Sequence, residues 1–278
     1  MPLSTFLRSL CAPESVLTCL RRDLGRLCVA AGRLPTAARL TAMIAASREG
    51  DIAVIEIDRH ERRNALDAAH CQALREAVEE LAGRGARAIV ITGKGSTFSA
   101  GADLGAAYDG PFRAALYAML TAITDVPAPV LAAVNGPAIG AGAQLAIACD
   151  LRIVAPAASF AIPTARLGLA VDPWTIRRLA ALSGAGTGTA QAVLVGCDAL
   201  DAARALASRA GGRDVALAWA RELASLAPLT LAYNKRVLNQ PADDAGLLEA
   251  YEACWASDDC SEGQRARAER RPPRFQGR

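Results

Sequence analysis

The chain has 278 residues, a formal net charge of +3, and 52% hydrophobic, 21% charged and 4% aromatic residues. That apolar fraction excludes a disordered protein, and no apolar run reaches the roughly 18 residues that a membrane-spanning helix needs. The charge is weak and no Lys/Arg run is interleaved with aromatic residues, so nucleic-acid binding is not expected.

Residues 1–42 differ from the rest of the chain in charge and in cysteine content. They carry six arginines against two acidic residues, and three of the eight cysteines. We expect this extension to lie outside the compact fold, and three interpretations compete: a mis-assigned translation start, an Arg-rich targeting presequence, and a short amphipathic appendage. The first is favoured, with Met43 as the true start, because the compact pattern begins only after it.

The other five cysteines form no CxxC pair, and only His60 and His70 could join them as metal ligands. A zinc site or a disulfide framework is therefore not expected, and reduced thiols indicate a cytoplasmic protein. His60 and His70 are assigned no functional role.

From Met43 onward, strands and helices alternate. Apolar, β-branched runs predict buried strands at 51–58, 87–92, 129–134 and 150–154. Helical spacing predicts helices at 67–81, 111–123 and 144–148. This alternation indicates an α/β fold with parallel strands joined by right-handed crossovers.

The second half of the chain reads as mostly helical. Helices are expected at 173–183, 187–195, 201–209, 214–226, 229–238 and 245–257. We therefore divide the chain into an extension at 1–42, a core at 43–195 and a helical region at 196–278. The late helices are apolar on one face, which fits burial against another subunit of an oligomer.

Two glycine-bearing turns follow predicted strands, at 99–103 (SAGAD) and 136–142 (GPAIGAG). Small residues let a ligand approach the backbone, and the second turn opens a helix whose N-terminus is partly positive. Two converging N–H groups would form an oxyanion hole. The alternative is that these are ordinary glycines of βα turns. Neither turn matches the GxGxxG or phosphate-loop pattern.

These turns and their flanking segments resemble the crotonase family, the enoyl-CoA hydratase/isomerase superfamily. The matching segments, in chain order, are 63–66 (RNAL), 100–104 (AGADL), 132–142 (AAVNGPAIGAG), 149–152 (CDLR), 160–163 (FAIP), 167–168 (LG), 177–179 (RRL) and 269–275 (ERRPPRF). The resemblance covers about 44–278 and is specific because the motifs occur in order.

The resemblance implies a spiral of ββα turns with a C-terminal helical trimerisation region, in a homotrimer or hexamer. It also implies a coenzyme A thioester as substrate or ligand, no other cofactor, and a role in fatty-acid or lipid metabolism. Two backbone N–H groups would bind the thioester oxygen: that of Ala102 in the first turn, and that of Ala141, which follows Gly140 in the second turn. The residues that it places around coenzyme A are Arg62, Arg63, Asn64, Ala65 and Ala100. The two arginines are equally well read as solvated surface residues.

The sequence departs from the family where hydratases place two glutamates that hold and activate water. These positions fall on Gln144 and Thr164, and neither side chain is a general base near pH 7. Efficient hydration is therefore not expected. In this respect the chain resembles glutamate-deficient members found in actinobacteria.

Asp172 is the best candidate base, because dienoyl-CoA isomerases have an aspartate at this position. The alternative is a structural role, since Asp172 followed by Pro173 is a typical helix start. Trp174 is expected to form a wall of the acyl pocket or to pack in the core. Asp103 and Asp150 are interpreted as structural.

Two functions remain open. The first is an acyl-CoA enzyme, an isomerase or a slow hydratase, which Asp172 favours. The second is a non-catalytic acyl-CoA-binding or carrier protein that presents its ligand to lipid-synthesis proteins, which Gln144 and Thr164 favour. A purely structural homologue that binds no acyl-CoA is disfavoured by the retained glycine turns.

Overall fold

The computed structural model describes residues 44–103, 105, 110–184, 188–202, 206–239 and 246–278. The chain divides into two units, Met1–Ala38 and Arg39–Arg278, and the second contains every described residue. The extension predicted at 1–42 lies outside the described residues, and the predicted boundary at 195 falls inside the second unit.

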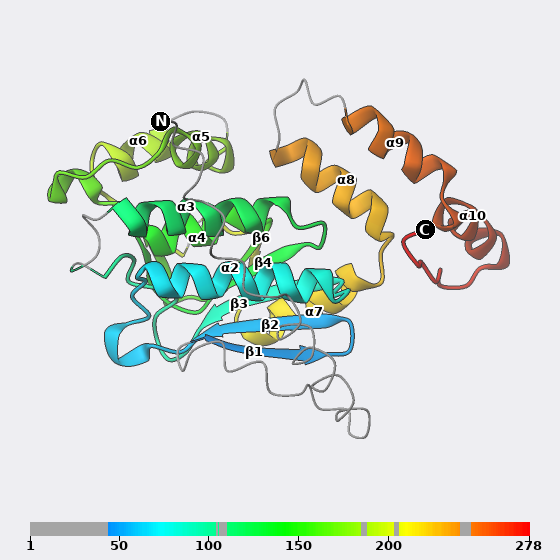
Figure 1. The fold of residues 1–278 in the computed structure, drawn as a ribbon, viewed down its shortest axis with the longest axis horizontal. Helices are drawn as coiled ribbons and strands as arrows, with labels where there is room; N and C mark the ends of the chain where they lie inside the picture. Colours follow the sequence, from blue (N-terminus) through cyan, green and yellow to red (C-terminus); the bar gives the residue numbers. More distant parts are fainter. Residues whose placement is uncertain (1–43, 104, 106–109, 185–187, 203–205, 240–245) are drawn as a thin grey trace, which may run out of the picture. The chain divides into compact units, whose positions relative to one another are not determined.

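A six-stranded sheet in the order β1-β2-β3-β4-β6-β9 forms the centre of the second unit (Figure 1). Its strands are β1 (Ile44–Glu49), β2 (Ile52–Ile57), β3 (Ala88–Gly93), β4 (Val130–Val134), β6 (Leu151–Val154) and β9 (Arg209–Ala210). From β2 to β9 neighbouring strands run parallel, so the four predicted strands and their direction are confirmed. The sequence missed β1, an alanine-containing edge strand that pairs antiparallel with β2.

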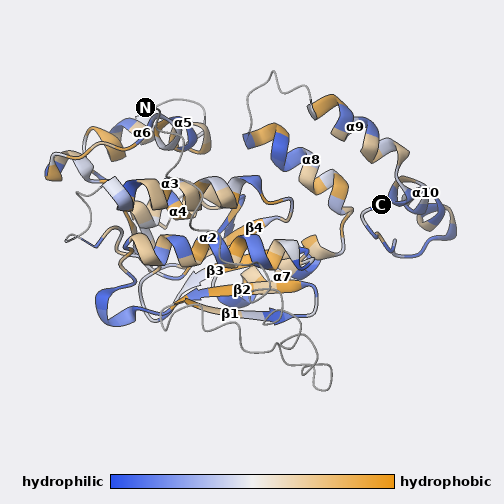
Figure 2. Cartoon of the chain, viewed as in Figure 1, coloured by the Kyte–Doolittle hydropathy of each residue, from blue (hydrophilic) through white to orange (hydrophobic). Residues whose placement is uncertain are grey.

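Helices cover both faces of this sheet. On one face lie α2 (Ala68–Gly83), α3 (Gly110–Asp125) and α4 (Ala141–Ala148), and α7 (Arg213–Ala224) packs on the other. Successive strand residues point to opposite faces, so Ile55 joins the core beneath α2 while Val54 packs against Ala216 and Ala220 of α7. Strands that are buried on both faces consist of continuous apolar runs. Figure 2 colours hydrophobic residues orange.

A second sheet, in the order β5-β7-β8, stands beside the first. Its strands are β5 (Ala138–Ile139), β7 (Ser159–Ala161) and β8 (Ala199–Asp201). The helix predicted at 201–209 was wrong for the described residues of that stretch, because it begins on β8 and ends on β9. Leu200 pairs with Phe160, and Arg209 pairs with Ile153, so partners distant in sequence decide the conformation.

The remaining helices follow the sequence prediction with one addition. They are α5 (Pro173–Leu182), α6 (Gly188–Leu194), α8 (Pro228–Asn239), α9 (Gly246–Ala256) and α10 (Asp258–Glu269), with short 3-10 turns η1 (His60–Arg62) and η2 (Thr164–Leu167). The sequence missed α10 because it is strongly polar and has no apolar stripe. Ser257 begins it as an N-cap, accepting from the Cys260 N–H.

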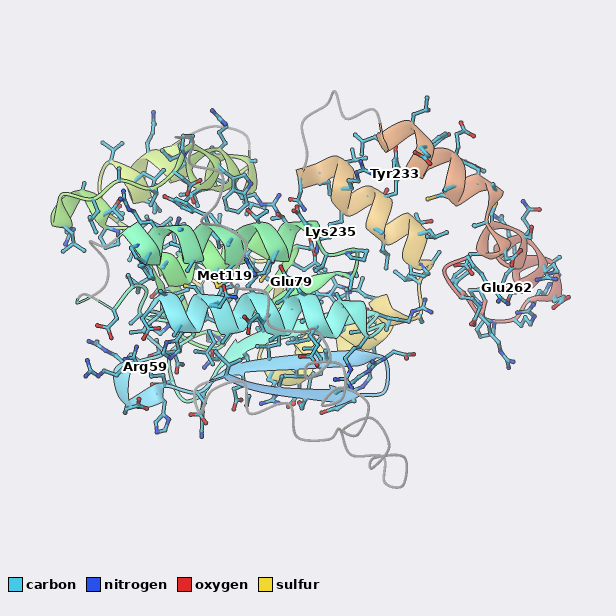
Figure 3. The ribbon with its side chains drawn as sticks, in the orientation of Figure 1. Arg59, Glu79, Met119, Tyr233, Lys235 and Glu262 are labelled. Atoms are coloured by element: carbon cyan, nitrogen blue, oxygen red, sulfur yellow. The ribbon has the colours of Figure 1, made fainter. Side chains whose placement is uncertain are left out.

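Lys235 links α8 to α3 and to the segments that precede β4 and β6. Its ammonium donates to the backbone oxygens of Ile123 and Ala128, and it lies 2.9 Å from the Asp150 carboxylate. Figure 3 shows Lys235 on the side of α8 that faces α3. Asp150 also accepts from the Val130 N–H at 2.8 Å, which matches its interpretation as a structural residue.

The described residues contain neither a single membrane-spanning helix nor a metal-binding cluster of side chains. No single helix there is long and apolar enough to cross a membrane, although α7 and α8, which meet at a bend of 112°, pass that test together. No group of three or more His, Cys, Asp or Glu side chains in this part of the chain could hold a metal ion.

Candidate active site

The two glycine-bearing turns lie against each other. Parallel bridges pair Leu66 with Ala102 and Ser99 with Ala138, and the Ile139 N–H donates to the Ser99 oxygen at 2.9 Å. Gly101 has φ +93°, and a Cβ there would stand 2.4 Å from the Ile139 oxygen. Only glycine fits this conformation at this distance. The glycine at 101 is therefore explained by the close contact between the backbones of the two turns.

Each turn presents a backbone N–H that has no acceptor among the described residues, on Ala102 in the first turn and on Ala141 in the second. One neighbour of each is bonded: the Asp103 N–H donates to the Leu66 oxygen at 2.7 Å, and the Gly140 N–H to the Ala161 oxygen at 2.8 Å. Ala141 opens α4, where the first N–H groups have no partner within the helix and the dipole is positive. A ligand with an anionic or carbonyl oxygen would satisfy both groups.

Ala102 and Ala141 line one cavity of about 140 Å³. Its walls come from the two turns, from α3, and from the segment that follows β7. The described lining residues are Ala100, Gly101, Ala102, Phe112, Arg113, Leu116, Tyr117, Ile139, Gly140, Ala141, Gln144, Pro163, Thr164, Leu167, Leu169, Ala170 and Val171. A mostly apolar cavity with two free N–H groups is suited to the carbonyl end of an acyl chain.

The contribution of α3 was not found by sequence reasoning. Phe112 and Leu116, and Arg113 and Tyr117, are spaced four residues apart, so two adjacent rows of one helix face line the cavity. Partial burial, together with the charge of Asp172, raises the pKa of Tyr117 and keeps its hydroxyl protonated. The only signal in the sequence was this spacing, which predicts a buried face but not what that face covers.

The two positions that replace the hydratase glutamates, Gln144 and Thr164, both line the cavity. Gln144 is buried, and its amide nitrogen donates to Thr175 Oγ1 at 2.8 Å and to Asp172 Oδ2 at 3.3 Å. No carboxylate belongs to the described lining residues. Trp174 is half-buried against the main core instead of standing in the cavity wall.

Asp172 is the N-cap of α5, accepting from the Thr175 N–H at 3.0 Å, with Pro173 in the first turn. The helix start predicted at this Asp-Pro pair is therefore confirmed. Its other oxygen accepts from the Thr175 hydroxyl at 2.6 Å and from the Gln144 amide. Asp172 thus stands directly behind a cavity residue, and both its carboxylate oxygens are engaged.

The segment predicted to meet coenzyme A follows η1. Arg63 and Asn64 both have left-handed backbones, with φ of 52° and 56°, a conformation that costs about 1–2 kcal/mol for each non-glycine residue. The buried Asn64 amide holds it by donating to the Thr97 and Lys94 oxygens at 2.7 and 3.0 Å. The Ala100 N–H donates to the Arg63 oxygen, so this segment lies beside the first turn.

This segment carries two exposed cationic side chains. Arg62 and Arg63 are exposed, and their guanidinium groups make no hydrogen bond or ion pair with a described residue. Ala65 is half-buried, and its oxygen accepts from Arg59.

Arg59 connects the segment to the turn that carries Ala102, a role that sequence reasoning missed. Its guanidinium lies 3.0 Å from Asp103 and 3.6 Å from Asp67. Figure 3 shows Arg59 beside the loop that follows β2. Asp103 is therefore structural, as interpreted. His70 is also structural, because it is buried and bonded to Asp67, whereas His60 is exposed beside Asp58.

Similar sequences identify the family of this chain. The family model described as enoyl-CoA hydratase/isomerase matches residues 47–278. The "Probable enoyl-CoA hydratase echA6" of Mycobacterium tuberculosis is 46% identical over 247 residues, covering 84% of this chain and 100% of that protein. A carnitinyl-CoA dehydratase of Salmonella enteritidis is 35% identical, covering 84% and 97%.

Solved structures show the same architecture. An enoyl-CoA hydratase from Mycobacterium tuberculosis superposes with a TM-score of 0.74 at 28% identity, covering 86% of this chain and 100% of that one. An enoyl-CoA hydratase from Bacillus anthracis gives a TM-score of 0.75 at 26% identity, with 84% and 99% covered. The family match spans most of the chain and the fold is shared, so this protein belongs to the enoyl-CoA hydratase/isomerase family and has the crotonase fold.

Proposed function

We propose that this protein binds fatty acyl-CoA thioesters, with the thioester oxygen held by the N–H groups of Ala102 and Ala141. The observation that carries the proposal is that these two donors line one cavity and have no acceptor among the described residues. Stabilising an enolate there would serve an enzyme, and holding the ground-state carbonyl would serve a carrier.

We further propose that hydration is inefficient. A hydratase needs a group that takes a proton from water, and Gln144 and Thr164 have no side chain that does so. A positioned general base contributes about 10²–10⁴ in rate, so losing two leaves binding with little turnover. A non-catalytic acyl-CoA-binding or carrier protein, handing its ligand to lipid-synthesis proteins, is the form of the function that this arrangement supports best.

The coenzyme A end would lie along the segment beside the first turn. Arg62 and Arg63 are exposed cations there, suited to phosphate groups, and the backbone of Asn64, Ala65 and Ala100 would line the adenine site. The Asn64 side chain is already bonded within the protein, so its contribution is to shape the loop.

We also propose a homotrimer or hexamer in the cytoplasm, with no metal or other cofactor. Several large apolar side chains of the late helices are exposed in a single chain, including Leu238 at 77%, Leu248 at 68% and Trp255 at 63%. Burial of such residues in a subunit interface would stabilise an assembly. Sedimentation would give the number of subunits.

Calorimetry with palmitoyl-CoA, crotonyl-CoA and free coenzyme A tests the binding proposal, and the ultraviolet absorbance of crotonyl-CoA reports hydration in the same samples. We expect thioester binding without loss of absorbance. Ala141→Pro is a specific probe, because proline at the first helical position removes one N–H yet fits the helix start. It should weaken thioester binding about tenfold and leave the melting temperature nearly unchanged. Rapid hydration would contradict the carrier function, and no binding would refute the proposal.

A second experiment tests whether the absence of the two glutamates is by itself the reason for inefficient hydration. In the Gln144→Glu/Thr164→Glu variant, crotonyl-CoA hydration should rise above that of the unaltered protein if the cavity otherwise holds the substrate correctly. The matched Gln144→Met/Thr164→Val variant supplies no base and should show no gain. Equal rates for the two variants would mean that the cavity does not position water.

The alternative function is a dienoyl-CoA-isomerase-like enzyme with Asp172 as the base. One observation favours it: Asp172 lies next to the cavity, bonded to Gln144 and close enough for its charge to act on Tyr117. Asp172→Asn keeps a good N-cap but removes the base. Isomerisation of a dienoyl-CoA that survives this change would eliminate Asp172 from proton transfer.

A further inference from the structure

The orientation of the Gln144 amide is determined by the residues behind it. Asp172 Oδ2 is a carboxylate oxygen, so the Gln144 atom that faces it at 3.3 Å must be the N–H-bearing nitrogen. The Thr175 hydroxyl donates its single proton to Asp172, so it can only accept from Gln144 at 2.8 Å. Two neighbours therefore require the same amide orientation, and Thr175 is fully buried.

This orientation leaves the Gln144 carbonyl oxygen for the cavity. Gln144 is one of the cavity-lining residues, and its Oε1 has no hydrogen-bond partner among the described residues. Tyr117 and Thr164 also line the cavity, but their hydroxyl groups can either donate or accept. Among these groups the Gln144 oxygen alone is restricted to accepting.

We infer that Asp172 and Thr175 are positioning residues that fix Gln144 as an acceptor, so the site selects acyl thioesters with a hydrogen-bond donor near carbon 3. This inference rests on the proposed thioester binding. Gln144 lies three residues after Ala141 on α4, which places their side chains about 5–6 Å apart on one face. Carbon 3 is two bonds of about 1.5 Å from the carbonyl carbon held at Ala141, so a hydroxyl there can reach Gln144.

Three ligands separate this inference from simple thioester binding: 3-hydroxybutyryl-CoA has a donor on carbon 3, acetoacetyl-CoA has an acceptor, and butyryl-CoA has neither. We expect the hydroxy thioester to bind about three- to tenfold more tightly than the 3-oxo thioester, because two facing acceptors leave the Gln144 oxygen unpaired.

Asp172→Asn tests the positioning role without removing the N-cap. Its new amide can donate to the Gln144 oxygen, which lets that side chain rotate and present N–H to the cavity. The preference should then disappear or reverse toward acetoacetyl-CoA. Thr175→Val removes the second orienting group and should reduce the preference, whereas Ile176→Ala, at an exposed position of the same helix, should retain it.

The test is to measure calorimetric dissociation constants for the three thioesters in the unaltered protein and in each variant. Circular dichroism checks that each variant is folded. Tighter binding of 3-hydroxybutyryl-CoA, lost or reversed in Asp172→Asn, supports the inference. Equal affinities for the three in the unaltered protein, or an unchanged preference in Asp172→Asn, refute it while leaving the proposed function intact. If no thioester binds, the proposed function fails and this inference fails with it.

Discussion

Gly101 offers the sharpest test of the contact between the two turns. Its φ is +93°, and a Cβ built there would lie 2.4 Å from the Ile139 oxygen and 3.3 Å from the Ala141 nitrogen. Both atoms belong to backbone, so Gly101→Ala cannot be accommodated by rotating a side chain. The turn that carries Ala102 and the turn that carries Ala141 must separate.

The size of the effect follows from these distances. An ordinary contact begins at 3.4 Å, so the turns must move apart by about 1 Å. An N–H group shifted by that amount from a 2.9 Å hydrogen bond no longer makes one. Backbone strain of about 1–3 kcal/mol and overpacking of about 1–3 kcal/mol give a total destabilisation of about 2–6 kcal/mol. Thioester binding should weaken at least tenfold through the lost donor.

Urea unfolding and calorimetry with palmitoyl-CoA measure the two effects separately. Gly105→Ala is the matched control, because among the described residues a Cβ there would meet only Asp103 Oδ1, at an ordinary 3.8 Å. This control should retain both stability and affinity. A Gly101→Ala protein as stable and as tight-binding as the control would refute the argument that contact between the turns positions the two donors.

Three further predictions concern stability and reactivity. Lys235→Met should lower the free energy of unfolding by about 2–4 kcal/mol in urea titrations, because it leaves Asp150 and two backbone oxygens without their cation; an unchanged midpoint would refute this. Cys149 should resist alkylation at pH 8 in the native protein and react after unfolding, as followed by peptide mass spectrometry, because burial raises its pKa to about 12. Arg271 and the Arg274 N–H lower the pKa of Glu262 to about 2, so its contribution to stability is complete above about pH 4.5 and is lost as the pH falls toward 2. The Arg274 amide should therefore stay protected from exchange at pH 4, and early loss of protection there would contradict the assignment.

Sequence patterning was sufficient for the central layer of the fold. β2, β3, β4 and β6 are buried on both faces, and such strands are continuous apolar runs that can be recognised without knowing their partners. β8 and β9 are three and two residues long and are stabilised by pairing with β7 and β6, so local periodicity suggested a helix there instead.

Part of the candidate site was also accessible from sequence. Glycines at close approach and a turn that opens a helix mark the two turns, because both signals are local, and the family resemblance assigns Ala102 and Ala141 within them. The helix start at Asp172 is likewise readable from two adjacent residues.

What only the tertiary structure decided is which groups face one another. The sequence gives no indication that one face of α3 brings Tyr117 into the cavity, or that Asp172 reaches back to the Gln144 amide twenty-eight residues earlier. Hydrogen-bond direction depends on the neighbours that folding supplies, whereas apolar periodicity depends on the chain alone. The sequence by itself therefore determined the family and the fold, and the packing of α3, α4 and α5 decided the polarity of the cavity.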